Sequence, residues 1–371
     1  MTRQTATSSI PGLPPRRHRG VAIAALIALT AVSGPVRGDR PADPPASQPA
    51  AAEPPPSGDV ANRPTIIDVM QNEARALESF ISTDTARAFI RAVDQLPVPD
   101  ARTIYHDAET STYLSAKDAE PIFEEEAARL REITLTPERY YVTKYGTPFA
   151  YARAIDLAAA HGLTFRPGMR TLDIGYGGIG PLRLLAANGC DAVGVDVDSF
   201  LPALYCESSD QGTFGTGEHA GRVTMIDGAW PGDDATRTAV GTGFDFIISK
   251  NTLKRGYIHP AREVDPKKTI DLGVDDATYV KALYDAAAPG ALVMIYNICP
   301  PLAKDDEPYV PWADGRCPFD EAVLRETGFE IIAYNTNDDE AVRAMGVHLD
   351  WGTREDLETS FYATYTLVRK P

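Results

Sequence analysis

The chain has 371 residues, of which 43% are hydrophobic and 24% are charged, and its net charge is −16. This apolar fraction is ordinary for a globular protein and excludes a largely disordered or fibrous chain. The negative charge repels phosphate backbones, so nucleic acid is not an expected partner.

The first 38 residues predict a signal peptide. Arg16, Arg17 and Arg19 precede an apolar stretch over 20–34, which is shorter than the roughly 20 residues that a membrane span needs. Val36 and Gly38 suit a cleavage site before Asp39. We therefore expect export, to a periplasmic or membrane-tethered location, with membrane contact only through an uncleaved leader. If the start codon is wrongly chosen, the protein is cytoplasmic.

Residues 39–62 are rich in proline and alanine and predict an extended, disordered linker. Residues 63–139 then predict a helical extension. Thr65 is a candidate N-cap for a first helix, a second helix follows Asp84, and an acidic helix is expected over about 121–132. The extension is expected either to pack against the domain that follows or to cover a pocket as a lid.

The rest of the chain, 140–371, alternates strands with helices. Thr147 and Pro148 open a helix that runs to about His161. Strands are then expected over 169–174, 191–196, 222–227, 244–249 and 291–297. Alternation of this kind predicts a parallel sheet with right-handed crossovers. Two late strands, 328–335 and 360–370, have no second helical crossover between them and predict a hairpin-like pair.

Four cysteines leave two alternatives open. None of them forms a C-x-x-C pair, and no histidine stands at metal spacing, so no metal site is expected. In an exported chain they could form one or two disulfides, and buried free thiols are the alternative.

The stretch TLDIGYGGIG over 171–180 fits two ligand motifs. Gly175, Gly177 and Gly180 match G-x-G-x-x-G, which is typical of dinucleotide sites. Asp173, Gly175 and Gly177 also match D-x-G-x-G. A carboxylate at Asp173 would repel a pyrophosphate but attract the ammonium and sulfonium of S-adenosylmethionine. The charge at Asp173 therefore favours S-adenosylmethionine over a nicotinamide dinucleotide.

Residues 140–371 resemble a class I S-adenosylmethionine-dependent methyltransferase. The resemblance rests on D-x-G-x-G, on Asp196 at the end of the second strand, and on Asp227 after the third, while Ile179 stands where that family usually has a glycine. It implies an α/β Rossmann-like fold, with a seven-stranded, mostly parallel sheet whose last strand is antiparallel. It also implies a cofactor site made of Asp173, Gly175, Tyr176, Gly177, Asp196, Val197, Asp227, Gly228 and Lys250.

Candidate catalytic residues follow the fourth strand. Asn251 could orient a polar acceptor through its carbonyl, and Tyr257 or His259 could take a proton from a hydroxyl. A loop hydrogen bond is the alternative role for His259. Methyl transfer requires alignment and exclusion of water more than covalent help, so no conspicuous catalytic motif is expected.

These features predict a methyltransferase acting on a small molecule or an envelope component. Because S-adenosylmethionine is made in the cytoplasm whereas the leader predicts export, a non-enzymatic binding module of the same fold stays open. An NAD-dependent oxidoreductase is the third alternative.

Overall fold

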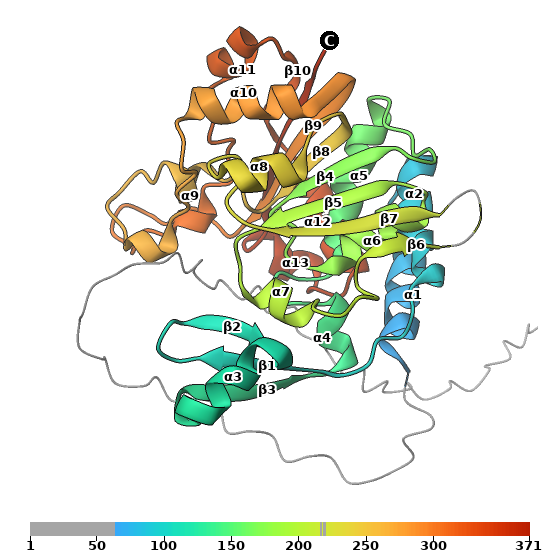
Figure 1. Cartoon of the computed structure of the whole chain (residues 1–371). Helices are drawn as coiled ribbons and strands as arrows, with labels where there is room; N and C mark the ends of the chain where they lie inside the picture. Colours follow the sequence, from blue (N-terminus) through green and yellow to red (C-terminus); the bar gives the residue numbers. More distant parts are fainter. Residues whose placement is uncertain (1–63, 216, 218–219) are drawn as a thin grey trace, which may run out of the picture.

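The computed structural model describes residues 64–215, 217 and 220–371. The expected signal peptide and linker lie outside the described residues. The described part forms a large mixed sheet covered by helices on both faces, with a smaller sheet beside it (Figure 1).

The large sheet has eight strands in the order β10-β11-β9-β8-β4-β5-β7-β6. The five predicted crossover strands are all present and mutually parallel. They are β4 (Arg170–Ile174), β5 (Asp191–Asp196), β7 (Gly221–Asp227), β8 (Phe244–Lys250) and β9 (Ala287–Cys299). The last strand, β11 (Tyr362–Arg369), is antiparallel and lies between β9 and β10 (Glu330–Asn337). The expected fold class is therefore confirmed. The sequence did not predict β6 (Gly212–Phe214), which adds an antiparallel edge to β7.

Two hydrophobic cores lie on the two faces of this sheet. One contains side chains of α5 (Ala152–Ala160), α6 (Ile179–Ala187) and α7 (Phe200–Leu204). The other contains side chains of α8 (Asp234–Val240), α10 (Asp276–Ala286) and α11 (Glu321–Thr327). Strand β4 is buried along almost its whole length, as expected for a parallel strand covered on both faces.

The prediction for the last two strands was partly wrong. They pair antiparallel, as expected, but two helices separate them in the chain, α12 (Asp339–His348) and α13 (Arg354–Glu358). Val342 and Met345 of α12 are fully buried in the first core. The segment between the strands is therefore part of the packed fold and no simple hairpin connection.

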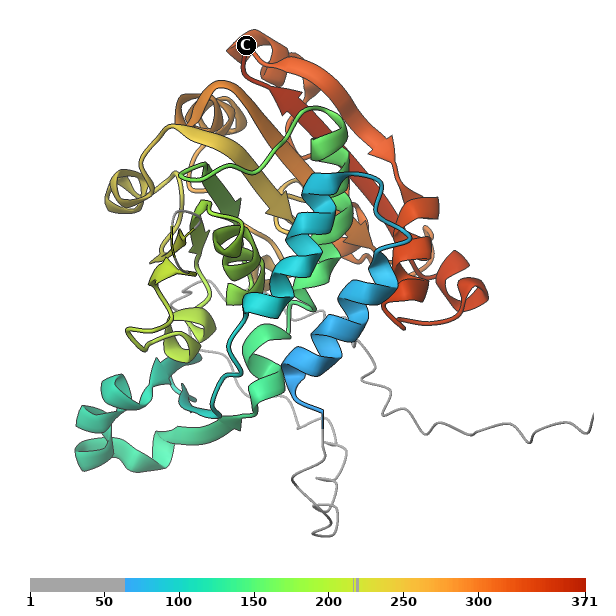
Figure 2. The ribbon, with the colours of Figure 1, turned by 90° about the vertical axis from the view of Figure 1, so that its right-hand side faces the viewer.

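The first two helices of the extension form as predicted. Helix α1 (Ile66–Leu77) begins at a capping box between Thr65 and Asp68, and α2 (Asp84–Arg91) follows. Helix α2 lies beside α5 and α1 lies beside α12 (Figure 2), and both contribute to the first core. The buried Asp156 of α5 accepts hydrogen bonds from the backbone and hydroxyl groups of Ser82 and Thr83, at 2.7–3.2 Å. These two helices are thus one packing unit with residues 140–371.

The rest of the extension differs from the expected helices. Strands β1 (Arg102–Asp107), β2 (Thr112–Ser115) and β3 (Leu130–Leu135) form a three-stranded antiparallel sheet. Helix α3 (Ala116–Glu126) starts before the acidic helix expected over 121–132, whose last residues belong to β3. Short strands with few buried residues carry a weak sequence signal, and pairing between distant segments decided this region.

Short helical segments complete the description: α4 (Pro137–Tyr141), η4 (Pro148–Tyr151), α9 (Arg255–Ile258) and the 3₁₀ turns η2 (Ala92–Gln95), η3 (Ala127–Arg129), η6 (Pro266–Lys268) and η7 (Pro311–Ala313). All four cysteines are unpaired, and only Cys206 is exposed. Among the described residues, every helix is too short or too polar to cross a lipid bilayer.

Candidate functional site

A cavity of about 1560 Å³ opens at the carboxyl ends of the parallel strands. This is where open α/β sheets place their ligands. The ends of β4, β5 and β8 form one side, and α1 with residues 142–151 forms another. Sites for one small molecule usually measure ~300–1,000 Å³. The cavity therefore has room for two ligands side by side.

The glycine loop forms part of the cavity wall, and its glycines are required by contacts. Gly175 and Gly177 have φ of +75° and +59°, in the left-handed region. A Cβ at Gly175 would lie 2.0 Å from Oγ1 of Thr252, and one at Gly177 would lie 2.8 Å from Cβ of Tyr145. The predicted loop therefore brings bare backbone to the cavity.

Asp173 lies near the end of β4, just before Ile174 and Gly175 of the cavity lining; it is 1% exposed and stands behind that lining. The hydroxyl of Tyr151 faces its carboxyl and lowers its pKa, but no well-formed hydrogen bond results, so both carboxyl oxygens lack a partner among the described residues. Burial has the larger effect and raises the pKa of Asp173 to about 7. A buried acceptor without a partner is costly, and a cationic ligand group would satisfy it.

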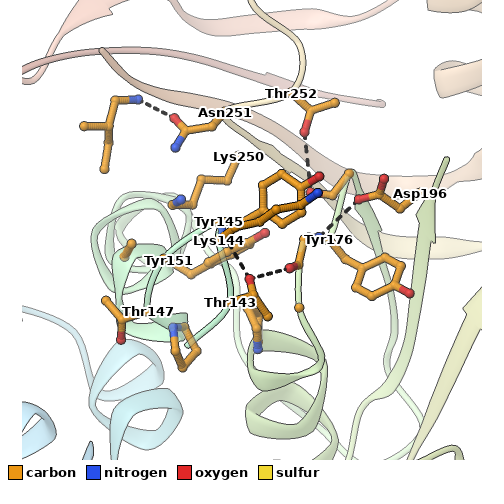
Figure 3. Close-up of a pocket in the computed structure, with 18 of the residues that line it drawn as sticks. Thr143, Lys144, Tyr145, Thr147, Tyr151, Tyr176, Asp196, Lys250, Asn251 and Thr252 are labelled. Carbon is orange, nitrogen blue, oxygen red and sulfur yellow. Dashed lines mark hydrogen bonds between the residues drawn. The ribbon is translucent and has the colours of Figure 1, made fainter. Parts of the chain in front are cut away.

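Lys250 ends β8 and lines the cavity. Its ammonium lies 5.3 Å from the ring centroid of Tyr151. Burial, helped by the charge of Lys254, lowers the pKa of Lys250 to about 8, while Asp173 acts in the opposite direction. A buried acid behind the cavity lining and a buried base within that lining therefore influence each other's pKa. In Figure 3, Lys250 and Tyr151 lie on one side of Tyr145, with Asp196 and Tyr176 on the other.

Asp196 ends β5 and also lines the cavity. Its carboxylate accepts backbone hydrogen bonds from Gly177 at 3.2 Å, Val197 at 2.8 Å and Asp198 at 3.1 Å. Burial raises the pKa of Asp196 to about 6 against the lowering effect of these donors. Because each carboxylate oxygen has more than one lone pair, Asp196 can accept further bonds from a ligand. Val197 is exposed and Gly228 lines the wall beside it.

Residues 143–145 contact the glycine loop and the segment that follows β5, a role that the sequence analysis did not predict. Thr143 donates a hydrogen bond from Oγ1 to the carbonyl of Gly177 at 2.7 Å. The ammonium of Lys144 lies 2.6 Å from Oδ2 of Asp198, and the hydroxyl of Tyr145 donates to the same oxygen. The crowded tyrosines of this segment were visible in the sequence, but nothing there indicated their partners.

Asp227 does not line the main cavity. It is exposed at the end of β7, in register with Asp196, and lines a smaller hollow of about 410 Å³ together with Tyr176. Its neighbour Gly228 reaches the main cavity instead. Because Tyr176 and Asp196 line both hollows, Asp227 lies beside the main cavity, and its contact with the cofactor stays a prediction.

Asn251 lines the cavity, and its carbonyl has one partner within the fold. The residue has φ of +65°, and its side-chain carbonyl already accepts a hydrogen bond from the backbone N–H of Ile298 at 2.7 Å (Figure 3). The carbonyl oxygen keeps a second lone pair and the amide keeps its N–H groups, so the side chain can still accept from or donate to a ligand.

Of the two proton-acceptor candidates, one reaches the cavity. Tyr257 lines it, and burial raises the pKa of Tyr257 to about 12, so the phenol stays protonated near neutral pH and acts as a donor. His259 is exposed, lies outside the cavity lining, and its Nε2 is 3.0 Å from Asp276. The structure thus gives His259 the loop contact that was its alternative role and does not bring it to the cavity.

Comparisons with known proteins give only distant likenesses. No family model matches this sequence, and no curated protein matches it. Among solved structures, phosphoethanolamine N-methyltransferase 2 of Haemonchus contortus in complex with S-adenosyl-L-methionine is 14% identical, with 80% of this chain and 75% of that chain covered and a TM-score of 0.36.

Two further solved structures are similar over a smaller share of this chain. An S-adenosylmethionine-dependent methyltransferase of Mesorhizobium loti is 16% identical, over 58% of this chain and 97% of that chain, with a TM-score of 0.34. The [4+2]-cyclase SpnF is 16% identical, over 59% and 81%, with a TM-score of 0.35. Likeness at this level carries no argument about activity.

Proposed function

We propose that this protein is an S-adenosylmethionine-dependent methyltransferase. The observation that supports this most directly is Asp173, a buried carboxyl whose oxygens find no partner among the described residues, under a glycine loop of bare backbone. A ligand that brings a cationic group to this point removes the cost of the unpaired acceptor.

The amino-acid end of S-adenosylmethionine fits the charges of Asp173 and Lys250. Asp173 would hold its ammonium, and Lys250 would hold its carboxylate. Asp196 would accept hydrogen bonds from the ribose hydroxyls, since it ends the neighbouring strand and has free lone pairs. The three side chains come from three adjacent strands, β8, β4 and β5.

A dinucleotide fits less well. Its pyrophosphate would lie against the glycine loop, next to the carboxyl of Asp173, where repulsion in a dry site costs several kcal/mol by a rough Coulomb estimate. The sheet also departs from the dinucleotide-binding order of six parallel strands, because antiparallel β11 lies between β9 and β10.

S-adenosylmethionine, when bound, supplies an electrophilic methyl group. The chain's own residues align the acceptor and exclude water. Tyr145 and Lys144, held by Asp198, cover the glycine loop. The amide of Asn251 and the phenol of Tyr257 can donate hydrogen bonds to an acceptor in the cavity.

A non-enzymatic binding module stays a second candidate, and a specific observation favours it. Neither predicted proton acceptor qualifies, since His259 lies outside the cavity lining and Tyr257 stays protonated near neutral pH. An acceptor that needs no deprotonation would make this observation compatible with catalysis as well.

Titration of purified protein tests the proposal. We expect saturable binding of S-adenosylhomocysteine by calorimetry, no binding of NADH by its fluorescence, and S-adenosylmethionine or its product in the mass spectrum of copurifying small molecules. Saturable NADH binding with no S-adenosylhomocysteine binding would overturn the proposal. Binding without any methylated product from an acceptor library would favour the binding module.

For the leader, we propose that residues 1–38 direct export and are removed. Their basic flank and short apolar core support this. Intact mass measurement of the protein from its native host checks it. A mature chain that begins near Asp39 is expected, and a chain that keeps the leader in the cytoplasmic fraction would contradict it.

A further inference from the structure

A second part of the cavity wall lies apart from the residues proposed to hold the cofactor. Helix α1 contributes Val69 and Glu73, one helical turn apart and therefore on one face. Thr147 contributes from the start of η4, and Trp351 and Phe361 contribute from the segments on either side of α13. Segments separated by almost 300 positions in the chain thus line one cavity.

Glu73 is the acidic group of this wall. Its Oε2 accepts a hydrogen bond from Oγ1 of Thr147 at 3.2 Å, and among the described residues it has no cationic partner. Burial raises the pKa of Glu73 to about 7, with Thr147 acting weakly in the opposite direction. Burying an apolar side chain here would cost less free energy than burying Glu73, because a carboxylate without a cationic partner loses hydration and gains only one hydrogen bond. The cost is removed when a cationic ligand binds.

Two aromatic side chains that line the same cavity suit an apolar body. The rings of Trp351 and Phe361 stack, with centroids 5.5 Å apart and an angle of 26° between their planes. Both are partly buried and packed against the first core, so their positions are fixed before a ligand arrives. Stacked aromatic faces attract apolar groups and organic cations.

This wall continues to the proposed cofactor site. Thr147 caps the turn that ends at Tyr151, so the two residues lie one turn apart. Tyr151 faces Asp173 and lies under the ammonium of Lys250. Glu73 and the glycine loop line the same cavity, so a molecule held by Glu73 would share that cavity with a cofactor held at the glycine loop.

We propose that the methyl acceptor is an amphipathic amine, whose cationic group binds Glu73 and whose apolar body lies against Trp351 and Phe361. This inference rests on the proposed function for the identity of the neighbouring ligand. It names the substrate class that the methyltransferase proposal leaves open.

Three probes that share a phenylethyl body and differ in their head group test whether the site prefers a cation. The full chain, saturated with S-adenosylhomocysteine, is titrated by calorimetry at mildly alkaline pH with 2-phenylethylamine, 2-phenylethanol and 3-phenylpropanoate. We expect the amine to bind about tenfold more tightly than the alcohol, and the acid to bind most weakly, since one charged contact typically changes a dissociation constant by this factor or more.

Two matched variants separate Glu73 from general negative charge. Glu73→Gln keeps an acceptor for Thr147 and should reduce the amine preference to about twofold or less. Glu138→Gln neutralises an exposed acid that also borders the cavity and should leave the preference unchanged. Trp351→Leu should weaken amine and alcohol alike and keep their ratio, because it removes the apolar contact only.

The outcomes also separate this inference from the proposed function. If S-adenosylhomocysteine does not bind the unaltered protein, the methyltransferase proposal fails, and the amine titration then runs on the ligand-free chain. Equal binding of amine and alcohol, an amine preference that survives Glu73→Gln, or no saturation by the amine up to about 10 mM overturns the amine site even when S-adenosylhomocysteine binds.

Discussion

At the residue scale, the carboxyls of Asp173 and Asp196 end adjacent strands but have different surroundings. Asp196 accepts three backbone hydrogen bonds, whereas the oxygens of Asp173 accept none among the described residues. Asp196 therefore shapes the turn after β5 whether or not a ligand is bound. Asp173 contributes mainly when a ligand brings a cation to it.

Asp196→Ala should weaken binding of S-adenosylhomocysteine by about 1–3 kcal/mol, through loss of hydrogen bonds to a charged acceptor. Calorimetric titration measures this. Asp191→Ala, at the opposite end of the same strand, is the control and should bind normally. An unchanged affinity for Asp196→Ala would remove this residue from the site.

Asp173→Asn should stabilise the ligand-free protein at about pH 8. The folded chain raises the pKa of Asp173 from 3.8 to about 7, so it keeps a proton that the unfolded chain has lost, and the stability contributed by this group falls as pH rises from about 4 to 7. Asparagine does not ionise, so the substitution removes this loss of stability. We expect the free energy of unfolding to exceed that of the unaltered protein by about 1–3 kcal/mol at pH 8, and by less at pH 5.

Urea unfolding at the two pH values checks this expectation. The same variant should bind S-adenosylhomocysteine more weakly, because the amide is uncharged. A variant that is less stable at pH 8 than at pH 5, relative to the unaltered protein, would show that ionised Asp173 is stabilised within the fold.

At the scale of elements, the loop from β4 to α6 is held between Thr252 and Tyr145. Gly175→Ala would combine backbone strain at φ +75° with a clash against Thr252. Gly168 is a matched control, since its φ is +73° and nothing lies within 4 Å of a Cβ built there. We expect Gly168→Ala to lower the free energy of unfolding by about 1–2 kcal/mol and Gly175→Ala to lower it further.

Thermal unfolding and titration with S-adenosylhomocysteine distinguish the two effects. Gly175→Ala should also lose affinity for this ligand by about tenfold or more, while Gly168→Ala should keep it. Equal behaviour of the two variants would mean that the contact with Thr252 does not constrain the loop.

At the scale of the whole molecule, α1 and α2 share a hydrophobic core with the sheet domain and are joined to it by Asp156. Asp156→Ala should lower the free energy of unfolding by about 3 kcal/mol, because the N–H and hydroxyl groups of Ser82 and Thr83 lose their buried acceptor. Tryptophan fluorescence and far-ultraviolet circular dichroism should still report a single unfolding transition. Two separate transitions would show that the extension folds independently of residues 140–371.

The sequence by itself determined the fold class and predicted several residues that line the cavity, among them Gly175, Gly177 and Asp196. Strand and helix periods, a proline at the start of η4 and glycines after β4 are local signals, and local signals fix element type and turn geometry. An acid at the end of β4 and another at the end of β5 follow from that register, because parallel strands bring their carboxyl ends to one edge.

Only the tertiary structure decided the remaining parts. Contacts between distant segments decide the pairing of β1 with β3 and the burial of α12. They also hold His259 outside the cavity lining and join the carbonyl of Asn251 to Ile298. That Glu73 and Trp351 line one cavity depends on them as well. Such contacts follow from the simultaneous packing of all elements around two cores, and no local pattern of residues encodes them.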